Sequence, residues 1–260
     1  MGQFFETIPD NLVKWILDQK MFWVSTAPLS ASGHVNVSPK GGLYFGILDD
    51  HTFWYMDLTG SGNETISHLY EPNNGRITVM FSAFEGPPRI VRLFGHGRVL
   101  ESGTGPFDDF VKKHDVQTIP GSRSIIIVDV HQVGSSCGFS VPFYSFKDFR
   151  QALNENMAKR IERYEQGKST ENMPRYWASK NSWSMDGLPG LEIGRRTAKE
   201  EGIIPLAKMV GPLAQQQKTY MRGQFGIEHL LLVAILTACL TASAVLMGPV
   251  AVRRLAKAGW

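Results

Sequence analysis

The chain has little cysteine and little net charge, and these features argue against a disulfide-bonded protein and against a nucleic-acid-binding protein. It contains 2 cysteines in 260 residues, Cys137 and Cys239, which lie far apart in the sequence. We expect no disulfide between them, and so low a count suits a reducing compartment. The net charge of +3 is too small to indicate a nucleic-acid partner. No run of basic residues interleaved with aromatics supports one either, so we predict no nucleic acid.

Motifs for metal binding and for serine hydrolysis are also missing. The 7 histidines are scattered, with no HExxH and no CxxC in the chain, so we expect no metal site. No Gly-x-Ser-x-Gly motif occurs, which argues against a hydrolase of that type. The loop at residues 134–138 contains Cys137. This thiol would be a nucleophile only if a base lies beside it, and otherwise it is an ordinary loop cysteine.

Charge is absent from residues 230–252 near the end of the chain. A run of about 23 uncharged residues is long enough to cross a hydrocarbon core of roughly 30 Å. The alternative is a buried core helix, but core helices seldom run this long without charge. We therefore predict a C-terminal transmembrane helix at 226–252, followed by a short basic tail at 253–260. Basic residues flank the run on both sides, so the positive-inside rule does not fix its orientation.

This span is only moderately hydrophobic, and its basic end is short. Such a segment resembles the tail anchors of mitochondrial outer or peroxisomal membranes. On this interpretation the protein is membrane-anchored by its C-terminus, and the remainder of the chain faces the cytosol.

The rest of the chain has the composition of a globular protein, with 43% hydrophobic and 20% charged residues. Segments rich in β-branched and aromatic residues alternate with Gly-, Pro- and Asn-containing turns, which is typical of strands. The predicted strands are 22–26, 34–37, 52–57, 76–81, 90–100 and 124–133. One helix is predicted to begin near Pro9. Three more are predicted at 64–70, 107–114 and 146–165. Short connections between strands predict an antiparallel barrel or sandwich, mainly β with flanking helices.

A turn of small residues, 59–63, follows one predicted strand and precedes a predicted helix. Such a turn presents backbone N–H groups and hydroxyls where a phosphate is favoured. The hydroxyls of Thr59, Ser61 and Thr65 are candidate phosphate ligands. The alternative is an ordinary helix cap made by Ser61 or Asn63.

Cations that would balance a phosphate charge occur at two places. Ser38-Pro39-Lys40 ends a predicted strand, and the two glycines that follow would let Lys40 project; the alternative is a solvated lysine in a turn. Arg89 and Arg92 lie on or beside the strand at 90–100. They would line either a cleft or a solvated face.

Taken together, several motifs in a fixed order resemble one known family. They are FWVSTA (22–27), GHVNVSPKG (33–41), LTGSGNETI (58–66), GRIT (75–78), FEGPPRI (84–90) and SSCGFSVP (135–142). Over residues 1–145 the chain resembles the pyridoxamine 5′-phosphate oxidase-like family, in an uncharacterised branch of it. A weaker similarity occurs at 180–181 and 186–190.

The resemblance implies an FMN-binding split β-barrel that forms a homodimer and holds the flavin in a groove between protomers. It also implies an FMN-dependent oxidoreductase. The implied domains are a barrel at 1–145 and a helical and irregular extension at 146–225. The implied cofactor-binding residues are Ser38, Lys40, Thr59, Ser61, Asn63, Thr65, Arg89 and Arg92.

Two departures from the family bear on the substrate. Members that oxidise pyridoxamine phosphate carry basic residues after the serine of the turn, where this chain has Gly62-Asn63-Glu64. They also end with an Arg-x-His element, and none occurs here. Both departures argue against oxidation of a B6 vitamer and leave the substrate open. Two alternatives remain: a non-catalytic dimer that holds flavin or haem at a membrane surface, and a dimerisation domain with an empty groove.

The tail interpretation makes a direct prediction. Removal of residues 226–260 should transfer the protein from the membrane pellet to the soluble fraction, because the deleted run supplies the apolar span. Fractionation of cells expressing each form measures this. A truncated protein that still pellets with membranes would contradict the anchor.

Overall fold

The computed structural model describes residues 2–212, 214, 235 and 237. The chain divides into two units, residues 1–208 and 209–260, and the fold described below lies in the first. The predicted membrane span and basic tail lie outside the described residues, apart from Ile235 and Thr237. No helix in the described part of the chain is long and apolar enough to span a bilayer.

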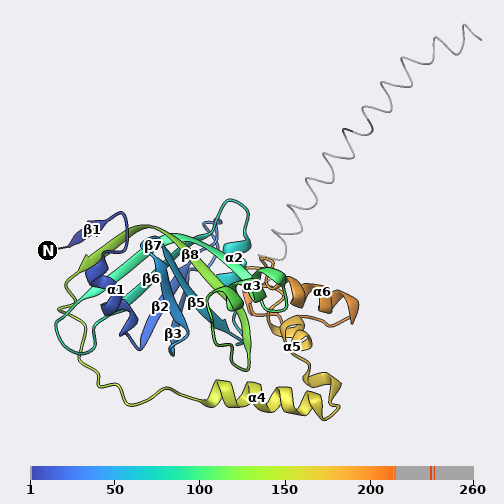
Figure 1. The fold of residues 1–260 in the computed structure, drawn as a ribbon. Helices are drawn as coiled ribbons and strands as arrows, with labels where there is room; N and C mark the ends of the chain where they lie inside the picture. Colours follow the sequence, from blue (N-terminus) through green and yellow to red (C-terminus); the bar gives the residue numbers. More distant parts are fainter. Residues whose placement is uncertain (1, 213, 215–234, 236, 238–260) are drawn as a thin grey trace, which may run out of the picture. The chain divides into compact units, whose positions relative to one another are not determined.

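A single antiparallel sheet of 8 strands dominates the first unit (Figure 1). Its order is β3-β2-β6-β7-β8-β5-β4, and β1 pairs with β8 outside this path. The strands are β1 (Gln3–Phe5), β2 (Met21–Thr26), β3 (Asn36–Gly41), β4 (Phe45–Asp49), β5 (Thr52–Leu58), β6 (Arg76–Ser82), β7 (Ile90–Glu101) and β8 (Ser122–Ser136). This mainly β, curled sheet with flanking helices fits a split barrel.

Most of the predicted strands are confirmed, and the differences have local causes. β3 begins at Asn36 and runs through Pro39 to Gly41. Proline is tolerated there because β3 is an edge strand, where a missing N–H breaks no ladder. The short strands β1 and β4 were not predicted, since three residues and a glycine-containing pentapeptide give no clear alternation.

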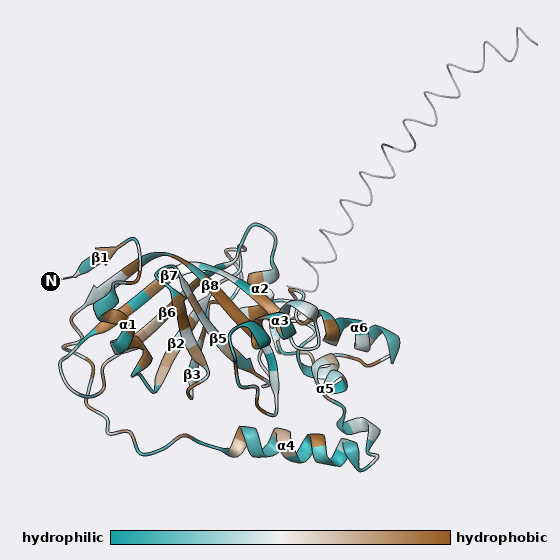
Figure 2. Cartoon of the chain, viewed as in Figure 1, coloured by the Kyte–Doolittle hydropathy of each residue, from teal (hydrophilic) through white to brown (hydrophobic). Residues whose placement is uncertain are grey.

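Aromatic side chains fill the interior of the curled sheet. Phe22 lies at their centre, with ring centroids 5.1 Å from Phe45, 5.6 Å from both Phe53 and Tyr55, and 5.4 Å from Phe81. These residues come from β2, β4, β5 and β6, so one cluster joins strands across the sheet. Such ring pairs add stability beyond that of the apolar area they bury. Figure 2 shows the apolar residues concentrated on the strands.

Helices cover the sheet where its surface is apolar. α1 (Asp10–Leu17) buries Leu12 and Ile16, and α2 (Glu64–Tyr70) follows β5 as the sequence predicted. α3 (Gly105–Lys113) places Phe107 and Phe110 against the outer face of β5 and β8, where they meet Met56, Ile125 and Ile127.

Residues beyond the predicted barrel domain belong to the same unit as the barrel, up to Lys208. They form α4 (Ala152–Glu165), the 3₁₀ turn η1 (Ser169–Glu171), α5 (Met173–Lys180) and α6 (Glu192–Glu200). The helix predicted at 146–165 begins only at Ala152. Figure 2 shows α4 to be largely hydrophilic, in keeping with Met157 as its only buried residue. In contrast, Trp177 and Leu191 join the barrel core.

Glu101 fastens this extension to the barrel. Its buried carboxylate accepts hydrogen bonds from the Tyr70 hydroxyl (2.7 Å) and from the backbone N–H groups of Glu192 (2.6 Å) and Ile193 (3.1 Å). Two of these donors are the first N–H groups of α6, which have no partner inside their own helix. One carboxylate on β7 therefore fixes where α6 begins.

Glu101→Gln should loosen the extension, because the amide nitrogen of glutamine cannot accept from these donors. We expect a loss of about 1–3 kcal/mol in the free energy of unfolding and faster protease cleavage within residues 173–208. Thermal melting and limited proteolysis measure the two effects. Glu192→Gln, an exposed change on α6, is the control, and equal behaviour of the two variants would contradict the anchoring role.

Candidate functional site

The most prominent polar feature of the barrel interior is an ion cluster around Asp57 on β5. The Asp57 carboxylate is fully buried. It accepts a hydrogen bond from Lys40 Nζ at 2.8 Å and another from Arg123 Nε at 2.7 Å. The Lys40 ammonium also lies 5.7 Å from the centroid of the Tyr55 ring, close enough for a cation–π contact.

The Lys40–Asp57 pair joins strands from opposite ends of the sheet. Lys40 is on β3, the edge strand at one end, and Asp57 is on β5, next to the edge strand β4 at the other end. Their side chains can meet only because the sheet curls round on itself. Ser38 lies two residues before Lys40 and shares its face of β3.

Arg123 connects the ion cluster to the small-residue turn. Along β5, Asp57 pairs with Ser124 and Leu58 pairs with Ser122, so Arg123 is the extra residue of a β-bulge. Its side chain is 5% exposed. Besides Asp57, its guanidinium donates to the backbone carbonyls of Gly62 at 2.7 Å and Gly60 at 3.3 Å. The buried Arg123 guanidinium therefore fixes the turn through two of its carbonyl groups.

Arg123 is not among the site residues predicted from the sequence. The signal was a single charged residue at the head of SRSIIIV, a segment otherwise buried in the sheet. A strand arginine beside buried isoleucines needs a counter-charge, because an unpaired buried cation is costly. The bulge that turns Arg123 toward Asp57 is not visible in the sequence.

Two opposing effects set the pKa of Asp57. Burial raises it, but the attraction of Arg123 and Lys40 and their hydrogen bonds outweigh burial and lower the pKa from 3.8 to about 2. Asp57 is therefore a permanent carboxylate at neutral pH. With two cations around it, the cluster keeps a formal charge of +1.

The predicted hydroxyl ligands are mostly engaged inside the protein. Thr59 accepts a hydrogen bond from Trp177 Nε1 at 3.0 Å, and Thr65 accepts one from Asn36 Nδ2 at 2.9 Å. Both threonines are buried. They hold the turn to α5 and β3 and do not face outward, whereas Ser61 is exposed.

The outer side of the turn is open at Gly60. No atom lies within 4 Å of the position that a Cβ would take there. The backbone N–H groups of residues 60–62 and the Ser61 hydroxyl form no hydrogen bond with any residue the structure describes. The carbonyls of this turn are bonded inward, and its remaining donors are available to a ligand.

The extension packs against the same turn. Asn181 Nδ2 donates to the carbonyl of Gly60 at 2.9 Å, and Met185 N donates to Glu64 Oε1 at 3.1 Å. Asn63 is buried, and its Nδ2 donates to Ser67 Oγ at 2.9 Å. Lys208 hydrogen-bonds to Asn63 Oδ1 and lies 3.3 Å from Glu64 Oε1. Neither Lys208 nor this packing was predicted.

Arg89 and Arg92 are not brought to this cluster. The Arg89 guanidinium lies 5.6 Å from the centroid of the Trp15 ring. Arg92 donates to Ser136 Oγ at 3.5 Å. On β7, Arg92 alternates with the buried Val91 and Leu93, so its side chain points to the outer face of the sheet, away from Asp57.

Other candidate chemistry finds little support in the geometry. Cys137 is a free, exposed cysteine, and no described histidine or carboxylate hydrogen-bonds to it. Across the described residues, no group of three His, Cys, Asp or Glu side chains could hold a metal ion. His96 and His131 are neighbours, with ring centroids 5.5 Å apart.

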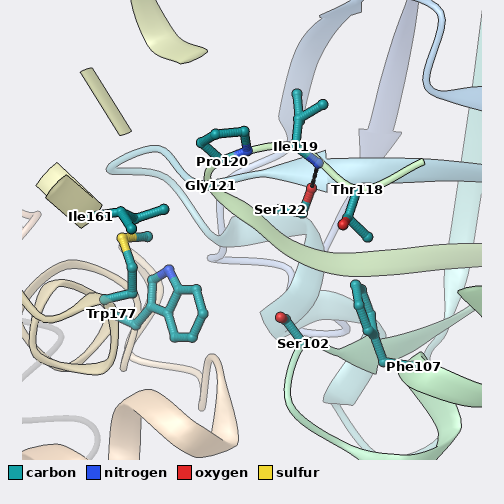
Figure 3. A pocket seen from close by; sticks show the side chains of 10 residues that line it. Ser102, Phe107, Thr118, Ile119, Pro120, Gly121, Ser122, Ile161 and Trp177 are labelled. Carbon is teal, nitrogen blue, oxygen red and sulfur yellow. Dashed lines mark hydrogen bonds between the residues drawn. The ribbon is translucent and has the colours of Figure 1, made fainter. Parts of the chain in front are cut away.

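A cavity of about 320 Å³ lies beside Trp177 and the loop at 118–122. Figure 3 shows Trp177 and Ile161 on one side of it and Phe107, Ser102 and Thr118 on the other. Trp177 links this cavity to the turn through its bond to Thr59. No charged side chain lines the cavity, so it offers a phosphate no counter-charge, unlike the open face at Gly60.

Acid should reveal the contribution of Asp57 to stability. Because its pKa is lowered in the folded protein, its stabilisation is present above pH 4 and is lost as the pH falls toward 2. We expect the free energy of unfolding to fall by about 2 kcal/mol over this pH range. Asp57→Asn should lack this component and be about 3–5 kcal/mol less stable at pH 7, since the buried Arg123 and the partly buried Lys40 lose their partner. Urea unfolding across this pH range measures both effects, with the exposed Asp50→Asn as control; identical curves for all three proteins would contradict the assignment.

Comparison with known proteins places the chain in a family. A family model described as pyridoxamine 5′-phosphate oxidase matches residues 8–137. A pyridoxamine 5′-phosphate oxidase family protein from Aspergillus flavus, ustO, is 42% identical over 208 residues, which are 77% of this chain and 82% of that protein.

Similar solved structures include HupZ from Group A Streptococcus, at 20% identity and a TM-score of 0.37, over 48% of this chain and 92% of that one. The FAD binding protein from Mycobacterium smegmatis is 11% identical with a TM-score of 0.35, over 51% and 97% of the two chains. Both TM-scores are too low to bear on the site. The family match and the fungal relative confirm the resemblance seen in the sequence motifs: this chain belongs to the pyridoxamine 5′-phosphate oxidase family.

Proposed function

We propose that this chain binds FMN and acts as an FMN-dependent oxidoreductase on a substrate other than a B6 vitamer. Membership of the family supports flavin binding. The single observation that carries the proposal is the link from Lys40 through Asp57 and Arg123 to the turn at 59–63. Two segments that the sequence assigns to one phosphate site are thereby connected by hydrogen bonds.

The residues present fit the phosphate of FMN. The backbone N–H groups of residues 60–62 and the Ser61 hydroxyl would donate to its oxygens, since none of them has another described partner. Lys40 and Arg123, which both bond to Asp57, would supply positive potential from the carbonyl side of the turn. Thr59, Asn63 and Thr65 then serve the site by fixing the shape of the turn.

In such a site the flavin and the protein have separate roles. The isoalloxazine ring of the flavin supplies the redox chemistry, and the protein binds and orients it. We assign no catalytic acid or base to this chain. Arg89 and Arg92 lie apart from the ion cluster of their own protomer, and either would act near the phosphate or the ring of a flavin held between two protomers.

We also propose that the protein works as a homodimer tethered to a membrane. The outer face of the edge strand β3 and the residues before it expose Val35 (70%) and Val37 (61%), an apolar surface that a second copy would cover. Membrane tethering rests on the uncharged run near the C-terminus alone.

A second candidate function is a non-catalytic dimer that holds flavin or haem. It is favoured by the missing Arg-x-His element, which in B6-oxidising members engages substrate. The two functions differ in turnover. Reduction of the bound flavin by NADH or NADPH, with reoxidation by an added acceptor, would exclude the non-catalytic alternative.

A charge placed at Gly60 tests where the phosphate binds. A side chain fits there without a clash, and Gly60→Asp would set a carboxylate against the phosphate. We expect FMN binding to weaken by about tenfold or more, as a lost charge-assisted contact would do. Titration of the full chain with FMN, followed by flavin fluorescence, measures the affinity.

Gly105→Asp is the matched control, because Gly105 also has no atom within 4 Å of its Cβ position and lies in α3, away from the turn. It should bind FMN like the parent. Equal FMN affinity for Gly60→Asp and Gly105→Asp would contradict a phosphate site at this turn.

A further inference from the structure

Lys208 is an unusually enclosed lysine at the end of the extension. Its side chain is 12% exposed, although lysines are rarely buried without a partner. Its ammonium group contacts Asn63 Oδ1 and lies 3.3 Å from Glu64 Oε1. An ammonium group has three hydrogens to donate, so one remains for a further acceptor.

Glu64 makes the turn an unfavourable place for an anion. Its Oε2 accepts a hydrogen bond from the N–H of Asn63 at 3.0 Å, which places the carboxylate directly against the turn. Burial raises the pKa of Glu64, but Lys208 and two backbone N–H groups outweigh burial and lower it. Glu64 is therefore ionised at neutral pH and would repel a phosphate bound at residues 60–62.

The formal charge around the turn depends on Lys208. The carboxylates are Asp57 and Glu64, and the cations are Lys40, Arg123 and Lys208. With Lys208 the five groups carry +1, and without it they carry zero. The turn provides no cation of its own, since residues 59–65 include no Lys or Arg.

We propose that Lys208 is a phosphate-binding residue of the flavin site, supplied to the barrel by the C-terminal extension to offset Glu64. This inference rests on the proposed function. It gives the extension a role in ligand binding: residues 173–208 complete a charge balance that the barrel alone lacks.

Burial and charged neighbours act on the pKa of Lys208 in opposite directions. Burial lowers its pKa, Arg123 lowers it further by repulsion, and Glu64 opposes both. Both cations contact the segment 60–63: Arg123 donates to the carbonyls of Gly60 and Gly62, and Lys208 donates to Asn63 Oδ1. A phosphate bound there would relieve the repulsion.

Titration of the full-length chain with FMN and with riboflavin tests the proposal, because riboflavin has the same ring and lacks the phosphate. Lys208→Ala should weaken FMN binding by about tenfold and leave riboflavin binding unchanged. Lys208→Arg should keep most of the FMN affinity. Lys199→Ala, an exposed lysine on α6, is the matched control and should bind both flavins like the parent.

A second variant separates charge from structure. Glu64→Gln combined with Lys208→Ala restores the formal charge of +1, so it should recover much of the FMN affinity that Lys208→Ala loses. A purely structural role for Lys208 predicts no recovery, and that result would overturn the proposal.

The remaining outcomes are also decisive. If the parent binds FMN and Lys208→Ala binds it equally well, the role of Lys208 is wrong and the proposed function stands. If Lys208→Ala weakens FMN and riboflavin alike, Lys208 does not recognise the phosphate. If the parent binds no FMN at all, the proposed function fails and the role of Lys208 fails with it.

Discussion

The buried carboxylate of Asp57 is the constraint on which the rest of the site depends. A charge removed from water must be paired, and Asp57 is paired twice, with Lys40 from one end of the sheet and Arg123 from the bulge in β8. The first pair requires the sheet to curl, and the second brings Arg123 under the carbonyls of Gly60 and Gly62. One buried charge thus links the curvature of the barrel to the shape of the turn.

The extension beyond the barrel is part of the same arrangement. Glu101 fixes the start of α6, Trp177 bonds to Thr59, and Asn181 holds the carbonyl of Gly60. The last two contacts use Thr59 Oγ1 and the carbonyl of Gly60, and they leave the N–H groups of residues 60–62 without a described partner. The segment that follows the barrel therefore packs against the turn of the proposed flavin site.

Sequence alone predicted most of the strands, several helices and the family, but not the charges that organise the candidate site. Segments rich in β-branched and aromatic residues and bounded by turn residues identified β2, β5, β6, β7 and β8. Residue type also singled out Lys40 and the turn. It assigned ligand roles to the hydroxyls of Thr59 and Thr65, which in fact bond within the protein. Arg123 and Lys208 were missed because a bulge and a folded extension, neither visible in the sequence, bring them to the turn.

Flavin binding can be measured by the visible absorption spectrum of the purified full-length protein, with identification of any cofactor that heat releases. We expect the bands of oxidised flavin and the release of FMN, or the appearance of those bands on titration with FMN. A colourless protein that FMN does not titrate would leave the fold and the family in place and contradict the function proposed for them.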